Sequence, residues 1–516
     1  MESSQRSKVN GRTIFGLLFG TYFLFVLYPI LRANRPQNDD LIRALSGGYY
    51  WDINGRPLTT LIMRTLELNL SSLVDFAPLP QLLAAIFLAL AGVLVAQRYR
   101  IRSPWLATLL VLPLGAQPFF LENLSFRFDA AAMALSVLLA LLPVTALRNT
   151  RMGFWAGIVS LLGCLCTYQP ALNIFLIFFL LDLIAMQAEQ VEPKRLGALA
   201  CRYGMQLLTA VAIYQWRVAP SIKEWVQEHS QTIRSFREFD VIMANAKAMA
   251  TFLLDAMAHR WMQVLLPLLA LTAIPTVVIG LSYALASRKN HGLHIFTTAS
   301  LIAFAILAPF LAIACLAGPM LLLRSPIITP RVFPGVGALI SAGLIMLYLA
   351  TNIVYSRRWA AYLPPVFAGI WALAMLTFAS IYGNASYAQQ QYESRIASQL
   401  SDDLAELKAK NSVTRFLLVG SAGLSPLTAH AADGFHVINT LVLPYLSERD
   451  FNSRNFMKLY TDMGEIRQPP AEDAAADALL ASACSAPVLY TRNRYTLRVI
   501  GDTAVVTFPG GRPPIC

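Results

Sequence analysis

Two adjacent carboxylates, Asp39 and Asp40, follow an apolar run that is long enough to cross a membrane. A solvated ion pair is the plainest interpretation, because Asp39 and Arg43 would face each other on a helix. The context favours a second interpretation, a catalytic role. Gly47 and Gly48 permit a bend, and the aromatic run ending at Trp51 is typical of the lipid headgroup level. A carboxylate beside apolar rings could take a proton from a hydroxyl as a general base. Both interpretations stay open on the residues alone.

Three later motifs, ENLSFRFD, TYQPALN and RSPIITPRVFPG, also place polar residues between apolar runs. Paired guanidinium groups beside a membrane suit a lipid phosphate, because their forked N–H groups match its oxygens. We therefore expect Arg324 and Arg331 to bind a phosphate, with Arg127 as a third candidate. Charges that reach to water and a helix break at Pro170 are the simpler alternatives. The other candidate substrate-binding residues are Asn38, Arg43, Trp51, Arg56, Glu122, Asn123, Asp129, Tyr168 and Gln169.

The composition indicates which elements position these residues. The 516 residues are 56% hydrophobic and only 14% charged, with a mean hydropathy of +0.53, which is typical of membrane proteins. The 41 Lys and Arg exceed the 29 Asp and Glu, as expected of basic loops beside anionic headgroups. No basic tract is long enough for a nucleic-acid site, so we expect membrane lipid, and not nucleic acid, as a partner.

Apolar stretches near 20 residues predict an α-helical polytopic membrane protein with about eleven transmembrane helices. The predicted spans are 13–31, 79–96, 104–121, 130–147, 154–167, 171–186, 203–219, 264–286, 293–323, 336–355 and 360–382. Cations concentrate in alternate connections, at 98–102, 148–151, 194–202, 288–289 and 357–358. This pattern predicts a cytoplasmic N-terminus, with all the motifs above on the periplasmic side. Asp182 lies inside a span near its cytoplasmic end, where we expect it to reach to water.

The chain changes in composition after residue 382. We predict a transmembrane domain at 1–382 and a small periplasmic α/β domain at 383–516, with an amphipathic helix, a strand RFLLVGS and a hairpin turning near Gly501-Asp502. Its GSAG lacks the Lys-Ser/Thr ending of a phosphate loop. A disulfide between Cys484 and Cys516 is plausible in an oxidising compartment. The domain could cap the site, bind a partner or recognise the acceptor, and we favour acceptor recognition.

The motifs NDDLIRALSGGYYWDINGRPLTTLI, ENLSFRFDAAAMALS, YQPALN and PRVF, taken in order, resemble the Gtr-type O-antigen glucosyltransferases of bacteria and phages. These are serotype-converting enzymes that modify lipopolysaccharide. The resemblance covers nearly the whole chain, including LLVGSAGLSP in the tail. It implies a GT-C-type fold in the bacterial inner membrane with a periplasmic active site. It also implies an undecaprenyl-phosphate sugar donor, usually glucose, an O-antigen acceptor, and an essential acid that maps to Asp39 or Asp40.

These residues permit a single displacement in which the acid deprotonates an acceptor hydroxyl and the arginines stabilise the departing lipid phosphate. We expect inversion and no cofactor; metal independence is favoured, although two acids leave a divalent cation possible. The leading alternatives are a lipid-linked sugar flippase and a GT-C glycosyltransferase with another acceptor. The sugar, the hydroxyl and the linkage stay open.

Overall fold

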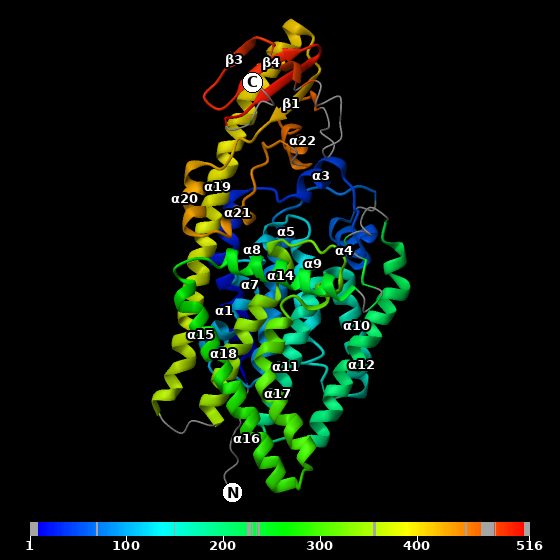
Figure 1. Cartoon of the computed structure of the whole chain (residues 1–516), viewed down its shortest axis with the longest axis vertical. Coiled ribbons are helices and arrows are strands. Elements are labelled where there is room, and N and C mark those ends of the chain that lie inside the picture. Colours follow the sequence, from blue (N-terminus) through cyan, green and yellow to red (C-terminus); the bar gives the residue numbers. More distant parts are fainter. Residues whose placement is uncertain are drawn as a thin grey trace. The chain divides into compact units, whose positions relative to one another are not determined.

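The computed structural model of the chain is mostly helical, with a small sheet near the C-terminus (Figure 1). It describes residues 9–68, 71–148, 150–223, 229, 231–233, 235, 238–353, 358–448, 451–465, 479, 481–483 and 485–509. The chain divides into two compact units. The membrane unit comprises Met1–Pro29 and Tyr49–Ser380, and the tail unit comprises Ile30–Gly48 and Ile381–Cys516. The acid motif therefore groups with the tail, an association that its position in the sequence did not indicate.

The membrane unit consists of helices and their connections. In chain order these are α1 (Gly11–Thr21), α4 (Pro57–Glu67), α5 (Leu79–Arg98), α6 (Pro104–Val111), α7 (Pro113–Ala116), α8 (Phe120–Ser125), α9 (Ala130–Leu141), α10 (Arg151–Thr167), α11 (Leu172–Ala188), α12 (Pro193–Arg217), α14 (Phe239–Ala256), α15 (Met262–Leu271), α16 (Ala273–His291), α17 (Ile295–Ala314) and α18 (Gly335–Ile353). A π-helix, Tyr22–Leu27, continues α1 into α2 (Tyr28–Ala33), and α19 (Leu363–Asn411, yellow in Figure 1) carries the chain into the tail unit.

Within the described residues, eight helical segments are long and apolar enough to cross a membrane, and three further apolar helices are shorter. The chain is therefore a helical membrane protein, while the number eleven stays a prediction. Small residues bring the helices together. A Cβ added to Gly92 on α5 would lie 2.5 Å from Leu18 Cδ1 and 2.9 Å from Val111 Cγ2, so a larger residue there would force these neighbouring side chains to shift.

The expectation that Asp182 reaches to water is wrong. Its side chain on α11 is fully buried and binds Arg98 of α5, whose Nε donates to Asp182 Oδ1 at 2.6 Å. Arg148, after α9, lies 2.9 Å from the other carboxylate oxygen, and Tyr203 of α12 donates to that oxygen at 2.8 Å. A buried carboxylate needs such partners because no water reaches it. Asp182 thus ties together segments from four parts of the membrane unit.

The Asp182→Asn variant is expected to be destabilised by about 3–5 kcal/mol, because Arg98 and Arg148 lose the buried carboxylate that they share. The measurement is thermal unfolding of the purified full-length protein in detergent. Glu189→Gln is the matched control, since Glu189 also pairs with Arg98 but its side chain is 37% exposed. Equal melting temperatures for Asp182→Asn and Glu189→Gln would contradict the structural role of Asp182.

The tail unit is built on a mixed sheet in the order β2-β1-β5-β4-β3. Its strands are β1 (Arg415–Val419), β2 (Gly464–Glu465), β3 (Val488–Thr491), β4 (Thr496–Ile500) and β5 (Thr503–Thr507). β1 runs parallel to β5, and β4 pairs antiparallel with β5 through a turn in which Gly501 has φ of 59°. The predicted helix, strand and hairpin are confirmed. β3 extends the hairpin into three antiparallel strands. Cys484 and Cys516 lie outside the described residues.

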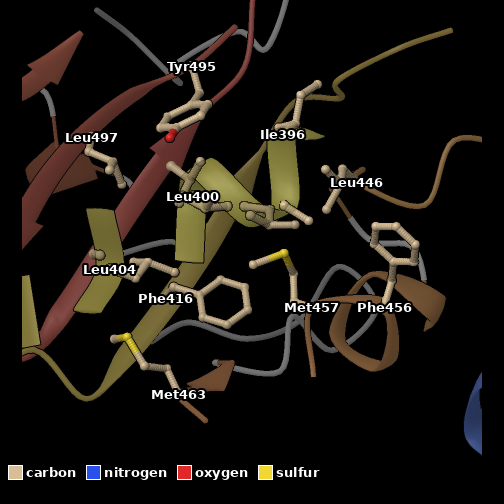
Figure 2. Close-up of a cluster of buried hydrophobic side chains, with 14 of the residues drawn as sticks. Ile396, Leu400, Leu404, Phe416, Leu446, Phe456, Met457, Met463, Tyr495 and Leu497 are labelled. Atoms are coloured by element: carbon tan, nitrogen blue, oxygen red, sulfur yellow. The ribbon is translucent and has the colours of Figure 1, made fainter. Parts of the chain in front are cut away.

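A hydrophobic core joins the second half of α19 to this sheet (Figure 2). Ile396, Leu400 and Leu404 recur every four residues, so they line one face of α19 and meet Phe416 and Leu497 from the strands. The remaining helices of the unit are α3 (Asp39–Ser46), α20 (Pro426–Gly434), α21 (Ile438–Leu441) and α22 (Phe451–Met457). Leu41 of α3 belongs to the same core, so the acid motif is packed into the tail unit.

Candidate functional site

The two adjacent acids differ in exposure because they begin a helix. Asn38 precedes α3 with φ of 40°, and successive residues of α3 then point about 100° apart. Asp40 is fully buried, and its Oδ2 accepts the Gln37 N–H at 2.8 Å. The Asp39 side chain is 48% exposed and lies 3.9 Å from Arg43. The expected i,i+4 ion pair is therefore present, and Asp39 is the more exposed of the two acids.

A second group of predicted residues meets around Arg331 in the membrane unit. Arg331 lies in a 3₁₀ turn, Pro330–Val332, before α18. Its backbone N–H donates to Glu122 Oε2 at 2.8 Å, and its guanidinium lies 3.7 Å from Glu122 Oε1. The Arg331 carbonyl oxygen accepts from Tyr168 Oη at 2.8 Å and from Asn123 Nδ2 at 3.3 Å. Residues from α8, from the α10–α11 connection and from the PRVF motif are thus joined at one arginine.

Tyr168 connects this group to a second arginine, Arg56, which caps the start of α4. The Arg56 guanidinium lies over the Tyr168 ring, 4.9 Å from its centroid. Burial raises the pKa of Tyr168 to about 12, so its hydroxyl stays protonated and donates to the Arg331 carbonyl. Arg56 Nε also donates to Gln169 Oε1 at 3.3 Å, and Asp129 Oδ1 lies 3.8 Å from the Arg56 guanidinium.

Asp129 is oriented by Trp51. The Trp51 ring is fully buried, and its Nε1 donates to Asp129 Oδ1 at 2.7 Å. Trp51 packs with Met63 and Phe128 in an apolar cluster, whereas the neighbouring Tyr50 is half exposed. The indole N–H of Trp51 is thus used inside the protein, and the headgroup level expected for this aromatic run stays a prediction.

Eight of the predicted residues form this polar network: Trp51, Arg56, Glu122, Asn123, Asp129, Tyr168, Gln169 and Arg331. Sequence reasoning missed Tyr214 of α12 and the turn at Gly55. Gln169 Nε2 donates to Tyr214 Oη at 2.9 Å, and Tyr214 Oη donates to the Gly55 carbonyl at 3.0 Å. Gly55 has φ of 72°, which the Asn-Gly pair in WDINGRPL signals as a turn. A lone tyrosine within an apolar span gives no such signal.

The other predicted cations bind elsewhere. Arg324 forms a forked pair with Glu238, at 2.8 and 3.1 Å, and its side chain is 42% exposed. Arg127 pairs with Asp75. Asn38, Asp39, Asp40 and Arg43 belong to the tail unit. Within the described part of the membrane unit, Arg331 and Arg56 are the predicted cations that share the network.

The network has the chemistry of an anion site. The Arg56 and Arg331 side chains keep 24% and 21% of their surface exposed. Their carboxylate partners are almost fully buried and lie 3.7 and 3.8 Å away, beyond the usual hydrogen-bond distance. Glu122 and Asp129 therefore orient the two guanidinium groups, and each guanidinium side chain stays partly exposed. Two oriented cations of this kind can stabilise a phosphate that leaves during group transfer.

A family model described as Glucosyl transferase GtrII matches residues 28–342. The chain thus belongs to the GtrII glucosyl transferase family, and it is a glycosyltransferase that acts on a sugar donor and an acceptor. It is also 23% identical, over 97% of its length and 99% of the relative, to a protein of Salmonella phage P22 described as an uncharacterized 55.3 kDa protein in the gtrB 5' region. No solved structure matches the chain.

Proposed function

We propose that the enzyme transfers a glucosyl residue from undecaprenyl-phosphate glucose to an O-antigen repeat of lipopolysaccharide, at the periplasmic face of the bacterial inner membrane. The observation that supports a lipid-phosphate donor is the network in which Arg56 and Arg331 are oriented by buried carboxylates. These arginines lie in a unit of membrane-length apolar helices, where a polyprenyl chain finds an apolar environment. The basic connections of the sequence support the orientation.

The reaction is an inverting single displacement. The oxygen of an acceptor hydroxyl attacks the anomeric carbon, the bond from that carbon to the phosphate oxygen breaks, and its electron pair leaves with the lipid phosphate. Arg56 and Arg331 stabilise the charge on that leaving group. The Asp39 carboxylate accepts the hydroxyl proton and then releases it to water. Asp40 keeps the loop closed through Gln37.

The decisive experiment is transfer by the purified full-length protein, with undecaprenyl-phosphate hexoses supplied one at a time and lipid-linked O-antigen as acceptor. A mass gain of one hexose in the acceptor is the expected result. Movement of the donor across vesicle bilayers without any transfer would favour the flippase alternative. Transfer only to another acceptor, such as lipid A, would keep the chemistry and refute the O-antigen assignment.

The Arg331→Ala and Arg56→Ala variants are each expected to raise the KM for the donor by about 10- to 100-fold. The reason is that each variant loses one charge-assisted hydrogen bond to the donor, which contributes roughly 1.5–3 kcal/mol. Arg324→Ala is the comparison, and we expect a smaller rise because the Arg324 guanidinium already binds Glu238 in a forked pair. KM values for donor and acceptor are measured separately. A larger rise in the acceptor KM would show that the network binds the acceptor.

The Asp39→Asn variant is expected to lower kcat by about 10²–10⁴-fold, the usual contribution of a general base. The Asp40→Asn variant should show a smaller fall in kcat, because an asparagine oxygen can still accept the Gln37 N–H. Both variants are assayed at matched expression, and the readout is the mass of lipopolysaccharide from expressing cells together with kcat in vitro. Full hexose addition by Asp39→Asn would refute its assignment as the base, and loss in Asp40→Asn alone would move that role to Asp40.

A further inference from the structure

The segment that precedes the acid motif is fastened to the tail unit by Arg35. This side chain is almost fully buried, and its guanidinium lies 2.9 Å from Glu393 Oε2 on α19. It also donates to the Leu443 carbonyl oxygen at 2.6 Å and lies over the Tyr445 ring, 4.1 Å from its centroid. Arg35 is four residues from Asp39, so these contacts fix where the acid helix begins.

Tyr445 binds two of the three residues between Arg35 and the acid helix, Pro36 and Asn38. Its hydroxyl donates to the Pro36 carbonyl oxygen at 2.5 Å and accepts the Asn38 N–H at 3.1 Å. Asn38 has a positive φ, a conformation that persists in a non-glycine residue only when its surroundings enforce it. Burial raises the pKa of Tyr445, so the hydroxyl remains a donor at every physiological pH.

Glu393 binds both Arg35 and the backbone at Tyr445 and Leu446. Its carboxylate is fully buried, with one oxygen on Arg35 and the other accepting the N–H groups of Tyr445 and Leu446, the latter at 2.9 Å. Beyond the acids, Leu41 is buried in the hydrophobic core of the tail unit. The acid motif is therefore held on both sides of Asp39 by residues that are more than 350 positions away in the sequence.

Two residues that hold the motif, Glu393 and Tyr445, lie outside the part of the chain that the family model matches. The family model ends at residue 342 and includes the acid motif, but not Glu393 or Tyr445. The phage P22 relative, in contrast, aligns over 97% of this chain. A relative that has kept the tail along with the membrane unit is what we would expect if the two act in one reaction.

We propose that the tail unit is the positioning scaffold of the catalytic acid, and that Tyr445 and Glu393 are positioning residues for Asp39. The inference rests on the proposed function, in which Asp39 is the general base. It replaces acceptor recognition as the main role of the tail. The direction of the Asp39 carboxylate depends on the backbone at Asn38, which Tyr445 fixes, and an error of about 1 Å in a reacting group can cost on the order of 100-fold in rate.

The test uses the full-length enzyme with the Tyr445→Phe variant, which removes only the hydroxyl. We expect kcat to fall about 10- to 100-fold, with the KM values for donor and acceptor within about twofold of wild type. Tyr460→Phe is the matched control: it removes a hydroxyl that binds Ser394 of α19 at 2.8 Å in the same unit, and kcat should stay within about twofold. Glu393→Gln, a second variant, should resemble Tyr445→Phe.

Two further measurements separate positioning from general destabilisation. Amide hydrogen exchange of residues 37–46 should accelerate in Tyr445→Phe while β1 and β5 exchange as in wild type. In the double variant with Asp39→Asn, Tyr445→Phe should cause no further loss of kcat, because it acts through Asp39.

The inference would be overturned if Tyr445→Phe left kcat unchanged or raised the acceptor KM alone. It would also be overturned if hydrogen exchange accelerated uniformly, or if the two losses of kcat multiplied in the double variant. A different pattern would show that the proposed function itself has failed. In that case the wild-type enzyme would transfer no hexose, or Asp39→Asn would keep its full kcat.

Discussion

Arginine bound to a buried carboxylate is the interaction on which both compact units depend. Inside a bilayer or a packed core no water is available, so an ionised side chain must find a protein partner. In the described residues five buried carboxylates meet this need with arginines: Glu122 with Arg331, Asp129 with Arg56, Asp182 with Arg98 and Arg148, Glu393 with Arg35, and Asp403 with Arg492. Each pair joins segments that are far apart in the sequence.

The same interaction serves different purposes according to its geometry. Around Asp182 the contacts are short and both arginines are nearly enclosed, so that cluster fixes helices. Around Glu122 and Asp129 the guanidinium groups lie 3.7 and 3.8 Å away and remain partly exposed. These carboxylates make their shorter bonds to a backbone N–H and to an indole, so they orient arginines that stay partly exposed.

The acid motif shows how a short loop obtains a fixed shape. A segment with a positive φ at Asn38 and two adjacent acids would not hold one conformation by itself. It does so here through Arg35, Tyr445 and the core contact of Leu41. The family model matches residues 28–342, a range that includes the motif but not Tyr445 or Glu393.

The sequence by itself determined the membrane class, the hairpin at Gly501-Asp502 and most residues of the polar network, because hydropathy, turn chemistry and unusual charges beside apolar runs are local signals. Only the tertiary structure decided which acid is exposed, that Arg56 and not Arg324 shares a network with Arg331, and that Asp182 is enclosed. Those outcomes depend on partners 70 to more than 350 residues away, such as Asp129 for Arg56 and Glu393 for Arg35. A local pattern cannot specify them, because a buried charge takes the partner that packing brings within reach.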